Sequence, residues 1–265
     1  MKYYRMNFTK ADFITTDRYW QSFPNVYYKT DVIHNGEPMY WRDNWIYPPN
    51  PGMPIIISGH SDYAITDELM EYYHPNVWFC VNKQTDRPNA FSLPLGITNN
   101  TNESDLHAIY GDLDSMIQVM GETIAFKNLV YMNFNIQTYP SERQIVWDLF
   151  QNVEYVTKGE TVNTIEGRTQ FLREIKAHTF VLCPRGNGID THRLWETLYM
   201  GSIPILRRDI AYVEFTDLPI CFVNDWKEIT PDFLESEKER IYNQTWNMDK
   251  LKIGYWIHKI QTSVR

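Results

Sequence analysis

The chain has 265 residues, of which 43% are hydrophobic, and a formal net charge of −8 at pH 7. This length is sufficient for two α/β domains with buried cores of their own. The acidic balance argues against a nucleic-acid partner or an anionic membrane surface, because both attract basic proteins.

The first 50 residues are rich in aromatic and polar residues and show no clean helix or strand period. The rings of Trp41, Trp45 and Tyr47 are of the kind that stacks on sugars, which makes this segment a candidate acceptor-binding site. They equally suit a loop that packs onto the domain, and both interpretations stay open.

A buried strand is predicted at Pro54–Ser58, followed by the polar loop Gly59–Asp62 and a helix containing Asp67–Met70. The loop therefore lies at the carboxyl end of a strand, the edge at which open α/β sheets place their sites. His60 and Asp62 are the candidates there for a general base, because either side chain can take a proton near neutral pH in a suitable environment. The structural alternative is that Asp62 caps the helix and His60 belongs to a turn.

One helix is predicted over residues 103–121, after a second strand at Val77–Asn82. Its pattern includes Asp112-Leu-Asp114, formally an Asp-x-Asp metal motif. A metal-binding pair of this kind ends a strand so that both carboxylates reach one cation, whereas this pair falls within a helix. We therefore expect no divalent metal at this position.

The second half of the chain again alternates strands and helices. Strands are predicted at Asn128–Phe134 and Val153–Thr157, and helices at Pro140–Phe150 and Thr169–His178. Arg143 lies in the first turn of one of these helices, where it faces either the solvent or a ligand at the sheet edge. Residues 246–265 carry enough apolar side chains for a last helix that packs back toward the first domain.

The stretch Phe180–Leu206 is predicted to form a strand, a glycine-bearing loop, a helix and another strand. Asp190 or Thr191 is expected to cap the helix, and Gly186 and Gly188 favour an irregular loop before it. Backbone N–H groups and the positive end of the helix dipole meet at the mouth of such a loop. This arrangement favours an anion such as phosphate.

Charged side chains strengthen the case for an anion at this loop. Arg185 and Arg193 add cations with forked donors that suit phosphate oxygens. Glu196 lies about one turn beyond Arg193, where its carboxylate can accept the hydroxyls of a ribose. The alternative for Arg193 and Glu196 is a surface ion pair. The candidate donor-binding residues are Arg143, Pro184, Arg185, Gly186, Gly188, Asp190, Thr191, His192, Arg193 and Glu196.

The sequence also predicts where the protein resides. No stretch approaches the ~18 apolar residues of a membrane span, and the first residues lack the apolar centre of a signal peptide. The three cysteines stand in apolar runs without C-x-x-C spacing, which indicates a reducing compartment and no cysteine metal site. We therefore expect a soluble, cytoplasmic protein without a membrane span.

The segments Pro184–Gly186, Arg193–Glu196 and Gly201–Ile205 together resemble the donor-binding motif of exostosin-like glycosyltransferases. In that family a strand ending in Pro-Arg-Gly leads into a helix with Arg-x-x-Glu and then into Gly-x-Ile-Pro-Ile. Several fixed positions within about 25 residues make the match more specific than a lone glycine motif. With no membrane span, the chain is most similar to the small soluble xylosyltransferase-like members from large algal DNA viruses, which would place it in the host cytoplasm.

The resemblance implies an α/β fold of the GT-B class, with two doubly wound Rossmann-like domains facing a cleft. Residues 1–125 would bind the acceptor, residues 126–245 the nucleotide sugar, and residues 246–265 would return to the first domain. It further implies a nucleotide-sugar donor, with a UDP-sugar and in particular UDP-xylose as the first choice, and a glycan hydroxyl as acceptor. No cofactor or divalent metal is expected.

The resemblance also implies an inverting reaction. Retaining enzymes of this fold commonly carry a second glutamate eight residues before the position of Glu196, and Gly188 stands there. Two other functions remain open. A GT-B fucosyltransferase using GDP-fucose shares the Leu-Trp and Gly-x-Ile-Pro-Ile elements but lacks the Cys183–Gly186 approach, and a non-enzymatic module could bind a nucleotide or glycan with the same fold.

Overall fold

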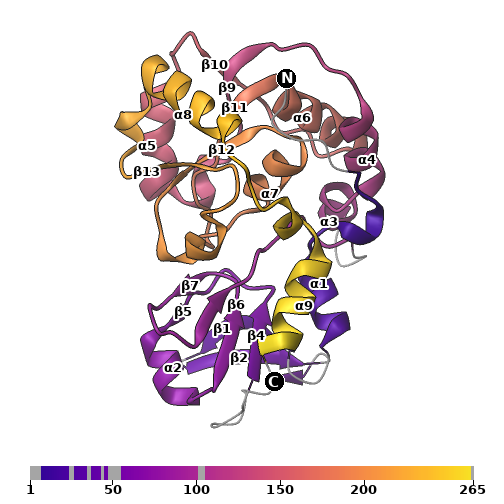
Figure 1. Ribbon diagram of the computed structural model, residues 1–265, viewed down its shortest axis with the longest axis vertical. Coiled ribbons are helices and arrows are strands. Elements are labelled where there is room, and N and C mark those ends of the chain that lie inside the picture. The colour runs from indigo at the N-terminus through magenta and orange to yellow at the C-terminus, as the bar shows by residue number, and fades with distance from the viewer. Residues whose placement is uncertain are drawn as a thin grey trace.

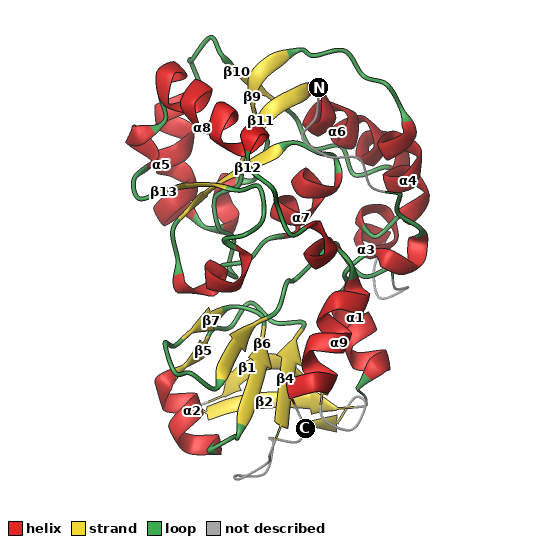
Figure 2. Cartoon of the chain, viewed as in Figure 1, coloured by secondary structure: helices red, strands yellow, loops and turns green. Residues whose placement is uncertain are grey.

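The computed structural model describes residues 7–23, 27–34, 37–42, 45–46, 55–100 and 105–263. These residues form two α/β bodies, one below the other in Figure 1, each built on its own sheet. Helices lie against both sheets, as the red and yellow elements of Figure 2 show.

The first sheet, in the lower body, has the strand order β3-β2-β1-β4-β6-β8 within the described residues. Its strands are β1 (Tyr27–His34), β2 (Glu37–Arg42), β3 (Trp45–Ile46), β4 (Ile55–Gly59), β6 (Val77–Cys80) and β8 (Ala90–Ser92). Strands β1, β4, β6 and β8 run parallel, whereas β1, β2 and β3 form an antiparallel extension. This extension lies in the first 50 residues, whose sequence pattern indicated neither helix nor strand clearly.

The central strands β4 and β6 bury side chains on both faces of the first sheet. Ile56 and Trp78 point toward α2 (Asp67–Tyr73), whereas their neighbours Ile57 and Phe79 belong to the cluster on the opposite face. Alternation along each strand sends successive side chains to opposite faces, so a continuous apolar run fills both. A short parallel pair, β5 (Ile65–Thr66) with β7 (Lys83–Gln84), lies beside the sheet.

The second sheet, in the upper body, is parallel throughout its described strands, in the order β10-β9-β11-β12-β13. The strands are β9 (Asn128–Met132), β10 (Val156–Lys158), β11 (His178–Leu182), β12 (Ile203–Arg207) and β13 (Cys221–Val223). The helices of this body are α5 (Pro140–Phe150), α6 (Ile165–Ala177), α7 (His192–Tyr199) and α8 (Pro231–Asn243). Strands and helices alternate along the chain, which gives parallel crossovers of the doubly wound type.

The two faces of the second sheet bury different helices. Val146 of α5 and Leu234 of α8 pack on one face, whereas Leu172 of α6 and Leu194 of α7 pack on the other. Prolines at the first position of α5 and α8 favour helix starts there, because proline has no N–H to lose at that position. Short 3₁₀ turns complete the body at η2 (Ile136–Thr138), η3 (Ile210–Phe215) and η4 (Trp226–Glu228).

The end of the chain lies beside its beginning. Helix α9 (Ile253–Ser263) runs next to α1 (Thr16–Ser22) in the lower body, after the turns η1 (Lys10–Asp12) and η5 (Met248–Leu251) (Figure 1). The ring of Trp256 is fully buried there, and its Nε1 donates to the carbonyl of Lys250 at 2.8 Å.

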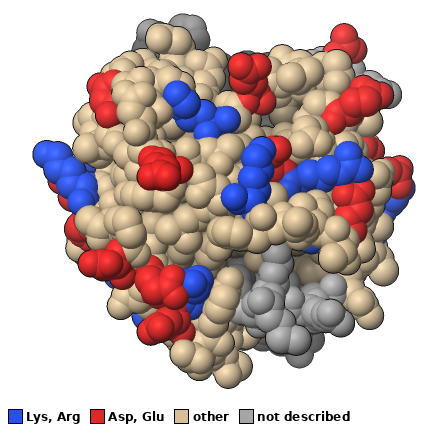
Figure 3. All heavy atoms as spheres, turned by 90° about the horizontal axis from the view of Figure 1, so that it is seen from above, with Lys and Arg blue, Asp and Glu red and all other residues tan. Residues whose placement is uncertain are grey.

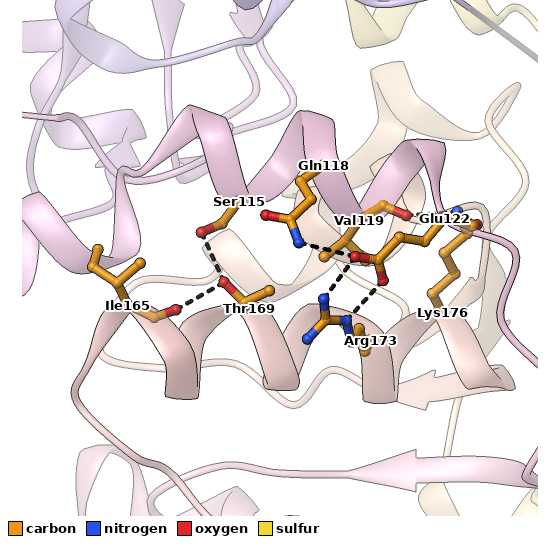
Figure 4. A network of polar contacts seen from close by, with 8 residues as sticks. All are labelled: Ser115, Gln118, Val119, Glu122, Ile165, Thr169, Arg173 and Lys176. Atoms are coloured by element: carbon orange, nitrogen blue, oxygen red, sulfur yellow. Dashed lines mark hydrogen bonds and ion pairs between the residues drawn. The ribbon is translucent and has the colours of Figure 1, made fainter.

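Two helices that precede residue 125 pack on the upper body. Figure 4 shows the seam between α4 (Leu113–Gly121) and α6, where Arg173 binds the carboxylate of Glu122 through two contacts of 2.7 Å. These hydrogen bonds from Arg173 lower the pKa of Glu122 to about 2. Lys176 donates to three carbonyl groups at the end of α4 at 2.6 to 2.7 Å, which satisfies acceptors that a helix end leaves unpaired. The predicted domain boundary near residue 125 stays a prediction.

The prediction of one helix over residues 103–121 is wrong. Among the described residues, α3 (Asp105–Tyr110) and α4 are separate helices, and the chain turns between them at Gly111. A Cβ at Gly111 would lie 2.7 Å from the backbone nitrogen of Asn100, so the close approach of two backbones needs glycine there. Asp112 then caps α4 by accepting from the N–H of Ser115 at 3.0 Å.

The predicted fold class is confirmed. The chain is an α/β protein with two Rossmann-like units, each built around parallel strands, and this is the arrangement of the GT-B class. The predicted boundaries of α5 agree with the structure, whereas β10 begins three residues later than predicted and α6 begins four residues earlier.

Candidate active site

A cavity of about 870 Å³ lies where the two bodies meet, and loops from both sheets line it. The loops follow strands β4, β6, β9, β10 and β11, so the site lies at carboxyl ends of parallel strands. Lining residues from the first body include Thr16, His60, Ser61, Asp62, Asn82 and Asn99; those from the second include Asn133, Arg143, Thr161, Gly186, Gly188, Asp190, Thr191, His192, Arg193 and Glu196.

Backbone hydrogen bonds join the loop before α7 to the first body. The N–H of Gly188 donates to Asp62 Oδ1 at 3.2 Å, and those of Ile189 and Asp190 both donate to Asn82 Oδ1 at 2.8 Å. We call these five residues the interdomain latch. The N–H groups of the latch are therefore used within the protein, which corrects the expectation that the loop presents free N–H groups to an anion.

Glycine is required at position 188 by the closeness of the latch. A Cβ there would lie 2.9 Å from Asn82 Nδ2 and 3.1 Å from Asp62 Oδ1. Asn82 itself has a φ of +59°, in the left-handed region that asparagine tolerates better than most residues. Two unusual residues thus hold the loop of one body against the strand ends of the other.

Asp190 is buried between the bodies and does not present a free carboxylate to the cavity. Its Oδ2 accepts from the N–H of Leu95 at 2.8 Å, and both its oxygens accept from Trp195 Nε1 at 2.9 and 3.0 Å. Burial raises the pKa of Asp190 to about 7. The predicted donor-binding residue Asp190 therefore also connects the first body to α7.

Arg193 and Arg143 bring two cations to the cavity. The guanidinium of Arg193 lies 4.9 Å from the centre of the Phe171 ring, and its Nε and Nη1 are buried without a hydrogen-bond partner among the described residues. Arg143 donates to the carbonyls of Arg185 and Asn135, each at 2.8 Å. Burial, and secondarily the charge of Arg193, lower the pKa of Arg143 to about 10. The negative charge of an anion in the cavity would offset the cost of burying Arg143 and its repulsion by Arg193.

Arg185 and Pro184 are not among the residues that line the cavity in the described part of the chain. The Arg185 guanidinium stacks 4.4 Å from the centre of the Tyr139 ring and donates to the carbonyl of Asn187 at 2.8 Å. The Arg185 side chain thus stabilises the loop to which it belongs. Its backbone N–H donates to Oε1 of buried Glu142 at 3.3 Å.

Glu196 has a buried partner that the sequence did not indicate. Its Oε1 lies 2.7 Å from Nη1 of Arg168 in α6, and both side chains are almost fully buried. The rings of Tyr110 and Phe171 flank the Arg168 guanidinium at 5.7 and 5.5 Å. The helical pattern of α6 showed its apolar face, but nothing in it indicated that Arg168 faces α7. The alternative of a surface ion pair between Arg193 and Glu196 is wrong, because Glu196 forms its ion pair with buried Arg168 instead.

The start of α7 also reaches the cavity. Thr191 is the N-cap residue of α7, and its hydroxyl is buried without a hydrogen-bond partner among the described residues. His192 Nδ1 donates to the carbonyl of Gly96 at 2.8 Å, and burial lowers the pKa of this histidine. His192 therefore adds a further contact between the bodies.

His60, which lines the cavity from the first body, pairs with an aspartate from α1. Nε2 of His60 lies 2.6 Å from Oδ1 of Asp17, and their side chains are 12% and 17% exposed. No sequence pattern indicated Asp17, because it lies 43 residues from His60 and in a segment with no clean helix or strand period. Of the candidate acceptor residues, Trp41 lies in β2 and Trp45 in β3, with side chains outside the described part, and Tyr47 lies outside the described residues.

Two further properties concern the described residues as a whole. No group of three or more His, Cys, Asp or Glu side chains among them is placed to hold a metal ion. No helix in the described ranges has the length and apolar character to cross a membrane. On the face shown in Figure 3, acidic and basic side chains are interspersed.

No protein family matches this sequence, and no curated protein matches it either. Among solved structures, the chain is similar to the crystal structure of an α1,3-fucosyltransferase with GDP-fucose. The identity is 12%, the TM-score is 0.42, and the alignment covers 82% of this chain and 79% of the fucosyltransferase chain.

Proposed function

We propose that the chain is a glycosyltransferase that moves a sugar from a nucleotide diphosphate donor to a hydroxyl of a glycan acceptor. The observation that carries this proposal is the shared cavity, which is lined by Arg193, whose buried donors lack partners among the described residues, and also by His60 and Asp62. Sugar transfer from a diphosphate requires a site for a leaving anion and a base for the attacking hydroxyl.

The donor diphosphate would occupy the side of the cavity at the start of α7. Arg193 and Arg143 would stabilise the negative charge that develops on the leaving diphosphate, together with the positive end of the α7 dipole. Because arginines can supply this charge, we expect transfer to proceed without a divalent metal. The buried carboxylate of Glu196 is the candidate for the ribose, held in place by Arg168.

The acceptor hydroxyl would approach from the first body. As its oxygen attacks the anomeric carbon, its proton passes to His60 or Asp62, and the bond from that carbon to the diphosphate oxygen breaks with its electron pair leaving on the diphosphate. One displacement of this kind inverts the anomeric configuration. Enclosure of the reacting groups between the two bodies would exclude water and limit hydrolysis of the donor.

A UDP-sugar, and UDP-xylose in particular, is the proposed donor. This choice rests on the resemblance of Pro184–Gly186, Arg193–Glu196 and Gly201–Ile205 to the exostosin-like motif. The same motif supports inversion, because Gly188 stands where a retaining enzyme of the fold commonly has glutamate. The aromatic residues Trp41, Trp45 and Tyr47 remain the proposed acceptor contacts.

The experiment is a binding and turnover panel on the full chain with UDP, GDP and their sugars, with and without EDTA. A ligand that binds only the native state raises the melting temperature, so a metal-independent shift with UDP-sugars is the expected result. Transfer to glycan acceptors would then be followed by NMR, which reports the anomeric configuration of the product. A shift with GDP-sugars alone would favour the fucosyltransferase, binding without turnover the non-enzymatic module, and no shift would refute the proposal.

A further inference from the structure

His60 and Asp17 form a short side-chain contact that is mostly shielded from solvent at the edge of the cavity. Nε2 of His60 lies 2.6 Å from the carboxylate of Asp17, slightly shorter than the roughly 2.7–2.9 Å of charge-assisted N–H···O contacts. Both side chains are mostly shielded from solvent, and His60 lines the cavity. An ion pair that forms in such a setting is screened less than one at the surface.

Each partner is held in place by its own support. His60 has a φ of +61°, a left-handed conformation that is uncommon for residues other than glycine and that persists only where the surroundings maintain it. The backbone N–H of Asp17 donates to Asn99 Oδ1 at 3.0 Å, and Asn99 Nδ2 donates to the hydroxyl of Thr16 at 2.9 Å. The start of α1 is thereby fixed at the edge of the cavity.

Asp62, the other candidate base, is engaged elsewhere. Its Oδ1 accepts a hydrogen bond from the N–H of Gly188 in the interdomain latch. The same oxygen lies 3.1 Å from where a Cβ at position 188 would be. The contact commits one oxygen of the Asp62 carboxylate to joining the two bodies. This contact favours His60 over Asp62 as the base.

We infer that Asp17 is the positioning residue for a His60 base, an inference that rests on the proposed transferase function. Asp17 orients the imidazole and fixes the tautomer with the proton on Nε2, so that the ring can take the proton of the acceptor hydroxyl. When the ring becomes an imidazolium, the Asp17 carboxylate stabilises its positive charge. Asp17 does not itself contact the substrate.

The test compares Asp17→Asn, His60→Ala and the double variant in steady-state transfer. Asp17→Asn is expected to lower kcat by about 10²-fold or more, within the range of general-base effects, while the donor KM changes little. In the His60→Ala background the same change is expected to have almost no further effect, because residues that act as a unit are not additive. Asp114→Asn, which removes an exposed carboxylate on α4, is the charge-matched control.

Two outcomes would overturn the inference. One is an Asp17→Asn enzyme that keeps its kcat, and the other is an equal loss of kcat with and without His60, which indicates a general structural role. A second measurement does not depend on the variants folding: the ¹⁵N NMR shifts of His60 in the wild-type protein should report a proton on Nε2, and a neutral ring with its proton on Nδ1 would refute the assignment. Absence of nucleotide-sugar binding and transfer in the wild-type protein would instead count against the proposed function.

Discussion

Nη1 of Arg168 lies 2.7 Å from Oε1 of Glu196, and both side chains are almost fully buried beside the cavity. Each of these buried charges offsets the cost of removing the other from water. Replacing Glu196 alone therefore leaves the Arg168 charge buried without a partner. We expect Glu196→Ala to lower the free energy of unfolding by about 3–5 kcal/mol, measured by urea denaturation. A loss below about 1 kcal/mol, typical of an exposed pair, would contradict this prediction.

The same pair offers a way to separate stability from donor binding. Replacing both charges together, as Arg168→Met with Glu196→Leu, removes the buried ion pair without leaving one charge alone and should recover most of the lost stability. If this folded double variant binds UDP more weakly than the wild-type protein, a Glu196 contact to the ribose is supported. An unchanged UDP affinity would leave Glu196 a stabilising residue only.

The interdomain latch predicts different effects for two neighbouring glycines. The Cβ of Gly188→Ala would meet Asn82 and Asp62, which are held by their own hydrogen bonds. The tightest contact of the Cβ of Gly186→Ala would be with the flexible end of the Arg143 side chain, at 3.3 Å. We expect Gly188→Ala to cost about 1–3 kcal/mol of unfolding free energy, as overpacking commonly does. Gly186→Ala should cost less than about 1 kcal/mol, because alanine also restricts the unfolded chain. Equal losses in urea denaturation would count against the latch.

The elements of the second body could be predicted because each depends on a local pattern. Helix α5 shows apolar side chains at helical spacing after Pro140, and β11 is a continuous apolar run closed by Pro184. The antiparallel extension β1 to β3 could not be predicted, since its residues show no regular alternation. The break at Gly111 was missed because it depends on a backbone approach to Asn100 that no local pattern records.

The sequence identified many of the residues that line the candidate site, but it did not identify the residues that they contact. The loop after β11 and the loop after β4 were both identified from strand ends, and both line the cavity. The partners of their side chains come from remote segments: Asp17 for His60, and Asn82 for the backbone of Ile189. Such pairs form only when the two bodies pack together, so a single sequence read locally contains no signal for them.

Arg185 and Arg193, the two arginines of the exostosin-like motif, are expected to behave differently in donor binding. Arg193 has buried donors without partners among the described residues, whereas Arg185 donates to its own loop and stacks on Tyr139. We expect Arg193→Met to weaken UDP binding by about 10-fold to 100-fold, the effect of losing one or two hydrogen bonds to a charged group. Arg185→Met should change the affinity by less than about threefold, by the same reasoning.

Isothermal titration at two salt concentrations checks this contrast. Because Arg193 is half-buried, its contribution should persist at higher salt better than that of an exposed cation. Arg193→Met should also keep the stability of the wild-type protein, since it removes buried donors that lack partners in the described part of the chain. A larger loss of UDP affinity for Arg185→Met than for Arg193→Met would show that the anion binds on the outer side of the loop.

The buried carboxyl of Asp190 predicts a pH dependence of stability near neutrality. Burial raises its pKa from the ordinary value of 3.8 to about 7, so the folded state holds this proton more tightly than the unfolded state does. The resulting contribution to the unfolding free energy is complete below about pH 4 and is lost as the pH rises through 7. A pKa difference of this size between the folded and unfolded states corresponds to at most about 4 kcal/mol of unfolding free energy.

Asp190→Asn isolates this contribution, because asparagine keeps the shape and does not ionise. One acceptor for Leu95 or Trp195 is lost, so the variant should be less stable at pH 5, yet the difference from the wild-type protein should shrink between pH 5 and pH 8. Comparing the two proteins cancels other titrations in this window, including that of His192, whose pKa is lowered by burial and which acts with the opposite sign. Urea denaturation at both pH values provides the measurement, and a constant difference would mean that Asp190 is ionised in the folded state throughout this range.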